Sequence, residues 1–142
     1  MKKILVPIDG SGNSKKALLK AKELGTLYNS EIVILNVVKD IVSHMYPASQ
    51  QYSIETNEVL VELGEQLLEE SLKYFEDYEA VVETKLMRGN PGKEIIEEVN
   101  ENDYDLVVIG SRGLGAFSRV FLGSVSNKVA NHVNVNVLIV KC

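Results

Sequence analysis

The sequence contains a single cysteine, Cys142, which is its last residue. No disulfide can therefore form within the chain, and neither a thiolate metal cluster nor a CxxC redox pair can be assembled. Long apolar runs are also missing: no stretch approaches the roughly 20 residues that cross a bilayer. Pro7 and Asp9 interrupt the first apolar run well before it reaches the length of a signal-peptide core. These absences predict a cytoplasmic protein with no membrane partner.

Positive charge is in deficit. The chain has 15 Lys and Arg against 20 Asp and Glu, a formal net charge of −5. Because binding to the nucleic acid backbone needs many cations that displace counterions, no nucleic acid partner is expected, and any anion must be held at a local site. With 142 residues, 45% apolar and 25% charged, the composition is typical of one globular domain, which we expect over residues 1–142.

Short apolar runs alternate with amphipathic segments along the chain. Continuous runs rich in β-branched residues are typical of parallel strands buried on both faces, and apolar residues three and four positions apart are typical of helices. Strands are expected at 4–8, 32–38, 80–86, 106–109 and 135–140, and helices at 13–28, 60–75, 91–99 and 124–132. The alternation predicts an α/β fold: a single doubly wound, five-stranded parallel sheet with helices on both faces.

Three local features add detail to this pattern. Charged residues alternate through 80–86, which indicates a strand at an edge of the sheet. Asn90 and Pro91 predict a helix start, since Asn caps free N–H groups and Pro gives up a donor that has no helical partner there. The connection at about 39–53 is long for a compact domain, and we interpret it as a mobile flap or a partner-contacting segment.

The segment that follows the fourth expected strand carries the most informative pattern. Gly110, Gly113 and Gly123 are followed by Ser124 and Ser126 at the start of the last expected helix. A helix N terminus leaves N–H groups unpaired and carries a partial positive charge, so a phosphate is stabilised there. Alone, a glycine often only closes a turn and a serine often only caps a helix. Together, after a buried strand, they favour phosphate binding.

The spacing Gly110-x2-Gly113-x9-Gly123-Ser124 resembles the ATP-binding signature of the universal stress protein family. The likeness also covers residues 4–11, 89–91, 104–109 and 137–140, and so spans nearly the whole chain. The resemblance implies the sheet order 3-2-1-4-5 and a Rossmann-like arrangement. In such sheets a ligand binds beyond the carboxyl ends of the strands where the winding reverses, here between the first and fourth strands.

The resemblance also implies roles for individual residues. In the family, the residue matching Asp9 lies beside the adenosine, the residue matching Val37 holds the adenine edge through its backbone, and the glycine loop holds ribose and phosphates. The nucleotide-binding residues implied are Pro7, Asp9, Val37, Gly110, Gly113, Gly123, Ser124, Val125 and Ser126. Mg or Mn is expected to be held mainly by the phosphates of ATP, with no protein ligand named. From the residues alone, Asp9 has a second interpretation as a cap or turn residue.

Other cofactor motifs are incomplete. Lys15 stands where the third glycine of a dinucleotide fingerprint belongs, and Gly92-Lys93 lacks the upstream glycine of a P-loop. His44 and His132 have no second histidine or cysteine at the spacing of a zinc site. A nicotinamide cofactor, a P-loop and a zinc centre are therefore not expected.

The function predicted is that of an ATP-binding regulatory switch in the stress response. Hydrolysis needs a positioned base and charge neutralisation at the γ-phosphate, for which only Asp9 and Arg112 are candidates, so a slow Mg-dependent ATPase stays open as an alternative. A nucleotide-free dimeric scaffold is the other alternative. The last strand, 135–140, is expected at an apolar sheet edge that invites pairing with a second copy, and the resemblance implies the same homodimer.

Overall fold

The computed structural model describes residues 1–40, 47–113 and 122–141. In this part of the chain the strands are β1 (Lys3–Pro7), β2 (Glu31–Val38), β3 (Val82–Arg88), β4 (Leu106–Gly110) and β5 (Asn136–Val140). The helices are α1 (Gly12–Tyr28), α2 (Pro47–Leu72), α3 (Pro91–Glu101) and α4 (Ser124–His132), with a 3-10 turn, η1 (Lys73–Phe75), directly after α2. Strands and helices alternate as the sequence predicts.

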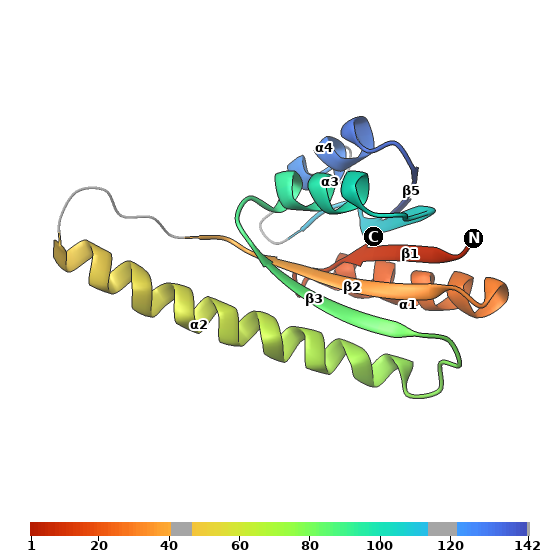
Figure 1. Cartoon of the computed structure of the whole chain (residues 1–142), viewed down its shortest axis with the longest axis horizontal. Coiled ribbons are helices and arrows are strands. Elements are labelled where there is room, and N and C mark those ends of the chain that lie inside the picture. The colour runs from red at the N-terminus through yellow and green to blue at the C-terminus, as the bar shows by residue number, and fades with distance from the viewer. Residues whose placement is uncertain (41–46, 114–121, 142) are drawn as a thin grey trace.

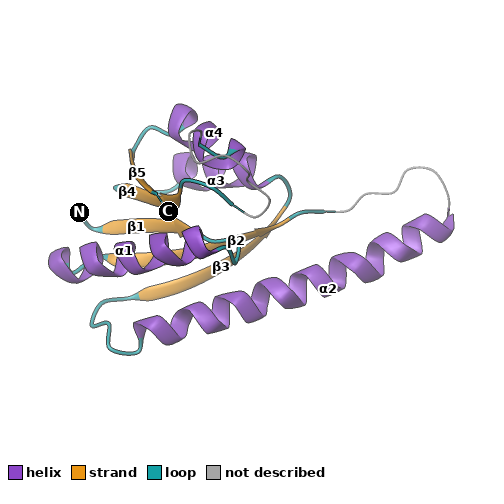
Figure 2. Ribbon diagram, turned by 180° about the vertical axis from the view of Figure 1, so that it is seen from behind, coloured by secondary structure: helices purple, strands orange, loops and turns teal. Residues whose placement is uncertain are grey.

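The strands form one parallel sheet in the order β3-β2-β1-β4-β5. Helices α1 and α2 cover one face, and α3 and α4 cover the other (Figure 1). The view from behind shows the same three layers, with α2 extending well past the end of the sheet (Figure 2). The predicted fold class and strand order are confirmed.

The core lies on both faces of the central strands. In β1, Ile4 and Val6 pack under α1 and α2, whereas Leu5 packs under α3 and α4, and all three are fully buried. Each such side chain contributes about 1.5–3 kcal/mol by leaving water. A strand covered on both faces needs apolar residues at every position, which is why these strands read as unbroken apolar runs.

The two outer strands are less buried, as their places at the sheet edges require. In β3 the side chains of Glu83 and Thr84 are exposed, which confirms the predicted edge strand. In β5 the residues from Val137 to Val140 are half-buried. Asn90 caps α3 by accepting a hydrogen bond from the Lys93 N–H at 3.0 Å, and Pro91 lies in the first turn as predicted.

The prediction of a connection from 39 to 53 is wrong over its second part, because α2 begins at Pro47. Proline is favoured in a first helical turn, where its missing N–H costs no hydrogen bond. The first part of the predicted flap, 41–46, lies outside the described residues. No helix within the described ranges is long and apolar enough to cross a membrane.

Candidate functional site

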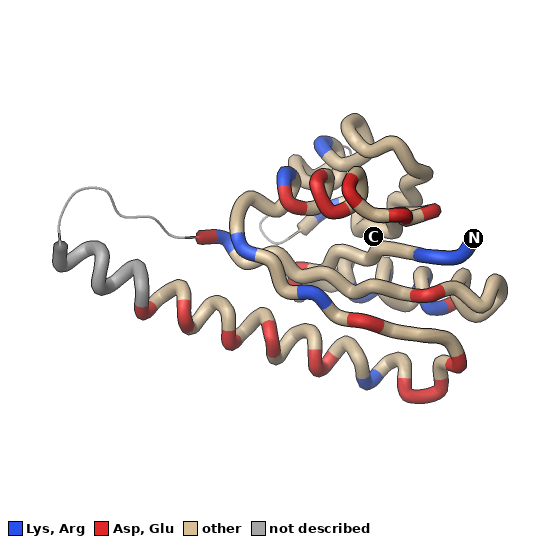
Figure 3. The backbone as a smooth tube through the Cα atoms, in the orientation of Figure 1, with Lys and Arg blue, Asp and Glu red and all other residues tan. Residues whose placement is uncertain are grey.

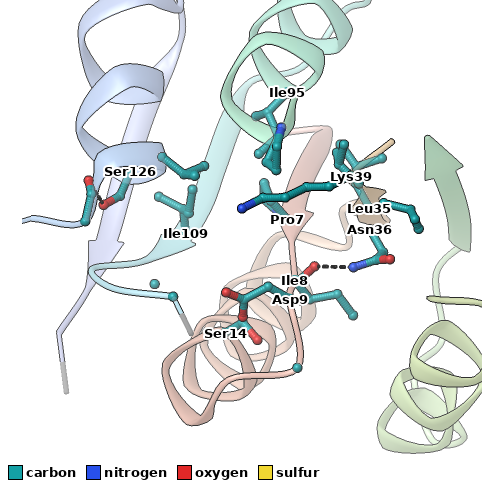
Figure 4. A pocket seen from close by; sticks show the side chains of 18 of the residues that line it. Pro7, Ile8, Asp9, Ser14, Leu35, Asn36, Lys39, Ile95, Ile109 and Ser126 are labelled. Atoms are coloured by element: carbon teal, nitrogen blue, oxygen red, sulfur yellow. Dashed lines mark hydrogen bonds between the residues drawn. The ribbon is translucent and has the colours of Figure 1, made fainter. Parts of the chain in front are cut away.

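A cavity of about 1060 Å³ opens beyond the carboxyl ends of the strands, where the sheet order turns from β1 to β4. This reversal point is where open α/β sheets hold their ligands. Figure 4 shows side chains that converge on it from several elements. All nine predicted site residues line it: Pro7, Asp9, Val37, Gly110, Gly113, Gly123, Ser124, Val125 and Ser126. The fold therefore brings together residues more than a hundred positions apart in the sequence.

The floor of the cavity is the chain that leaves β1. The Ile8 N–H donates to the Leu35 carbonyl at 2.8 Å, and the buried Asn36 amide donates to the Ile8 carbonyl at 2.8 Å. These two bonds hold the end of β1 against β2 beyond the last ladder pair. Gly10 then turns the chain toward α1 with a φ of 87°, a conformation that side chains with a Cβ rarely adopt.

Asp9 lies between this turn and the glycine loop. Its Oδ1 accepts the Ser11 N–H at 2.9 Å, which fixes the turn, while Ser11 caps α1 by accepting the Ser14 N–H at 3.1 Å. Its Oδ2 faces Gly113, where an added Cβ would collide with the carboxylate. The structure therefore shows Asp9 acting as a turn residue. Its position beside the glycine loop also allows contact with a ligand, which stays a prediction.

Ser111 joins the two ends of the glycine loop. Its carbonyl accepts the Gly123 N–H at 2.7 Å and the Ser126 hydroxyl at 3.0 Å, and its own N–H donates to the Val140 carbonyl at 2.9 Å. Ser111 is buried, with 6% of its surface exposed. Sequence reasoning missed this residue, because a serine between two loop glycines gives no sign that its carbonyl accepts two bonds.

The three signature glycines have different neighbours. An added Cβ at Gly110 would lie 2.9 Å from the Asn13 carbonyl carbon, so Gly110 lets β4 end against the first turn of α1. An added Cβ at Gly123 would lie 3.3 Å from the Arg112 Cα, so Gly123 lets the loop ends approach. Gly113 instead lies directly beside the Asp9 carboxylate. Two of the glycines therefore serve packing even before any ligand is considered.

Helix α4 begins at this loop with Gly123 as its N-cap, and no side-chain hydrogen bond caps it within the described residues. The first-turn N–H groups of a helix have no intrahelical acceptor, and here the residues of that turn, 123–126, line the cavity. Ser124 is exposed, whereas Ser126 is 2% exposed and donates its hydroxyl to backbone carbonyls. Ser124 is therefore the serine of the pair whose hydroxyl is accessible from the cavity.

Much of the remaining lining of the cavity is apolar and comes from residues that the sequence reasoning did not assign to a site. Its side chains lie on α2, α3 and the strand ends: Leu60, Leu63, Leu67, Ile95, Ile109 and Leu35. Helix α2 approaches closely at Gly64, where an added Cβ would lie 2.7 Å from the Asn36 Oδ1. Leucines at helical spacing predict a core face, and no further signal marked these as cavity residues.

The net charge of the described cavity lining is opposite in sign to the net charge of the whole chain. Among the described lining residues, Lys39 and Arg112 are cationic and Asp9 is anionic, which leaves one net positive charge in a chain of net charge −5. Acidic residues gather elsewhere, along α2 and on α3 (Figure 3). Together with the N terminus of α4, this arrangement suits an anionic ligand that also has an apolar part.

A polar cluster around the buried Glu98 lies apart from the cavity. Glu98 of α3 accepts hydrogen bonds from the Lys85 Nζ at 2.6 Å and from the Tyr104 hydroxyl at 2.7 Å. Burial alone would raise the pKa of Glu98, but these two donors outweigh it and the pKa is lowered. Burial, followed by the bond to Glu98, raises the pKa of Tyr104. No His, Cys, Asp and Glu group in the described part of the chain could hold a metal ion.

The sheet order and the cavity at its reversal point define a doubly wound α/β protein with an open cavity at the carboxyl ends of its strands. The sequence model of the universal stress protein family matches residues 1–141, and the chain belongs to that family. The universal stress protein YxiE of Bacillus subtilis is 34% identical over 98% of both chains. The universal stress protein MJ0531 of Methanocaldococcus jannaschii is 31% identical over 99% of this chain and 82% of its own.

Solved structures share the fold across the whole chain. The universal stress protein UspA of Lactobacillus plantarum has a TM-score of 0.90 at 24% identity, over 99% of this chain and 97% of that one. An Arabidopsis thaliana family member with AMP bound has a TM-score of 0.69 at 23% identity, over 99% and 92%. A universal stress protein in complex with cAMP has a TM-score of 0.68 at 24% identity, over 98% and 96%. At these identities the likeness is one of fold.

Proposed function

We propose that the chain binds ATP in this cavity and acts as a nucleotide-dependent regulatory switch in the stress response. The observation that carries the proposal is the convergence of all nine predicted site residues on one cavity, beside a helix N terminus without a side-chain cap among the described residues. The AMP and cAMP complexes of proteins with the same fold support it, since both ligands are adenine nucleotides. In this proposal residues 1–142 act as one nucleotide-binding domain in the cytoplasm.

The two walls of the cavity suit the two halves of a nucleotide. The apolar residues near Val37 and Leu35 on β2 would hold the flat base, while the N–H groups of Ser124 and Val125 would hold phosphate oxygens. Gly113 lines the cavity without a side chain, so its backbone can lie directly against a ligand. The cavity, at about 1060 Å³, lies just above the 300–1,000 Å³ range of small-molecule sites, so an ATP molecule is within its capacity. Mg or Mn would reach the site on the phosphates.

The first experiment is mass spectrometry of the purified protein, in which we expect adenine nucleotide to co-purify. Thermal unfolding with ATP and magnesium should then show a higher melting temperature, because a ligand at 100 times its Kd stabilises the folded state by about 2.7 kcal/mol. GTP at the same concentration is the control. The proposal fails if no adenine nucleotide co-purifies and ATP at millimolar concentration leaves the melting temperature unchanged.

Regulation is favoured over turnover by the surroundings of Asp9. One of its oxygens already accepts the Ser11 N–H, so this carboxylate acts in the turn as well as at the cavity. No second carboxylate is among the described lining residues, so a general base separate from this turn residue is not present there. We therefore propose that ATP is held rather than consumed, and phosphate release from purified protein with ATP and magnesium should not exceed the rate without protein.

A further inference from the structure

Lys39 enters the cavity from the wall that faces the glycine loop. It follows the last residue of β2 directly and is one of the residues that line the cavity. Figure 4 shows its side chain crossing above Pro7, with the ammonium group directed toward the side of the cavity that holds Ile109. The sequence reasoning gave this residue no role, because a lysine at the end of a strand is usually a solvated surface residue.

The charges around Lys39 leave its ammonium group available. The carboxylate next to it in the sequence, Asp40, is bound by the Arg88 Nε at 3.0 Å. Within the described residues, no carboxylate lies within ion-pair distance of the Lys39 Nζ. Arg112, the other cation at the cavity, comes from the opposite wall. The β2 wall thus contributes a cation to the cavity and no competing anion.

We propose that Lys39 binds a phosphate group of the ligand and makes the site prefer phosphorylated nucleosides over nucleosides. This role rests on the proposed nucleotide binding. The long stem packs over the apolar floor at Pro7, while the ammonium carries three donors on a flexible chain and can follow a phosphate. A phosphate held at the α4 N terminus then meets donors from both walls, and a charge-assisted bond of this kind is stronger than a neutral one.

The same position of Lys39 also fits a steric role, in which the side chain only fills space and the expected change in ligand affinity is the opposite. If the Lys39 stem only fills space in the cavity, a ligand must displace it, and shortening the side chain would strengthen binding of every ligand, charged or not. Phosphate recognition instead weakens binding only for ligands that carry phosphate. Charged and uncharged ligands therefore separate the two roles.

The test is calorimetric titration of the full chain with ATP, AMP and adenosine. Lys39→Gln removes the charge and keeps most of the stem. We expect its ATP affinity to fall about tenfold, as the loss of a charge-assisted bond implies, with the fall shrinking at high salt and adenosine affinity unchanged. Lys39→Arg should keep ATP affinity within about threefold of the wild type, because it keeps the charge. Lys2→Gln is the matched control: Lys2 directly precedes β1, at the end of the strand away from the cavity, and this variant should behave as wild type.

The affinities measured for the wild type and the variants decide whether Lys39 binds phosphate and whether the chain binds nucleotides at all. Equal ATP affinity for Lys39→Gln and wild type, or stronger binding of all three ligands, overturns the role of Lys39 and leaves nucleotide binding standing. Wild-type protein that binds none of the three ligands overturns the proposed function and this role together. Lys39 is exposed and follows the strand end, so the variants should keep the wild-type melting temperature without ligand, which shows that they are folded.

Discussion

Gly110 and Gly113 belong to the same sequence signature, but an added Cβ would meet backbone atoms at Gly110 and a side chain at Gly113. An added Cβ at Gly110 meets the backbone of Asn13, which cannot move without shifting α1. An added Cβ at Gly113 meets only the far end of the Asp9 side chain, which can rotate away. We expect Gly110→Ala to lower the free energy of unfolding by about 1–3 kcal/mol, the usual cost of overpacking. Gly113→Ala should keep stability within about 0.5 kcal/mol and weaken ATP binding.

Urea unfolding of both variants, followed by ATP titration, measures the two effects. Gly12→Ala is the matched control, because an added Cβ there has no atom within 4 Å and the position is helical. Alanine is favoured over glycine in a helix, so this variant should be at least as stable as wild type. Equal stability of Gly110→Ala and Gly12→Ala would contradict the packing role of Gly110, and unchanged ATP affinity of Gly113→Ala would remove Gly113 from the site.

At the scale of elements, Glu98 ties α3 to β3 and to Tyr104, two residues before β4. Its carboxylate accepts hydrogen bonds from Lys85 and Tyr104, so Glu98→Gln removes the negative charge that faces the Lys85 ammonium. We expect a loss of about 1–3 kcal/mol in the free energy of unfolding. The folded-state pKa of Glu98 is lowered, so this contribution is complete above the unfolded-state pKa near 4.5 and is lost as pH falls through the folded-state pKa.

Urea unfolding at neutral pH and at pH 3 measures this dependence. The difference in stability between wild type and Glu98→Gln should be largest at neutral pH and should shrink in acid. Glu97→Gln is the matched control: the neighbouring carboxylate is exposed and 3.9 Å from the Lys93 Nζ, and such surface pairs contribute little. A difference that does not change with pH would show that the Glu98 charge is not the source of the stabilisation.

The elements that sequence reasoning placed well depend on local chemistry. Asn90 with Pro91 starts a helix as predicted, because the Asn side chain caps a free N–H group and Pro needs no acceptor in the first turn. The glycine spacing located one wall of the cavity for the same reason. Lys39 and the α2 leucines were missed because their roles depend on which elements the fold brings opposite them. The start of α2 at Pro47 was missed because residues 47–53 carry no strong apolar period.

At the scale of the whole molecule, the two edges of the sheet differ in how they are protected. The β3 edge carries the exposed Glu83 and the half-buried Lys85, and charged residues on an edge strand oppose pairing with another chain. The β5 edge carries the apolar run from Val137 to Ile139, which is only half-buried. An apolar edge with free backbone groups favours strand addition, so β5 is the edge at which a second copy would bind.

We therefore expect a homodimer that pairs through β5. Sedimentation equilibrium at micromolar concentration should give twice the mass of the chain. Leu138→Lys places a charge on the apolar edge and should shift the protein toward the monomer, whereas Thr84→Lys on the exposed β3 edge, the matched control, should leave the dimer intact. Unfolding of Leu138→Lys must be followed in parallel, because Leu138 also packs against the core under α1. A wild-type chain that sediments as a monomer, or a dimer broken by Thr84→Lys, would contradict the assignment of the interface to β5.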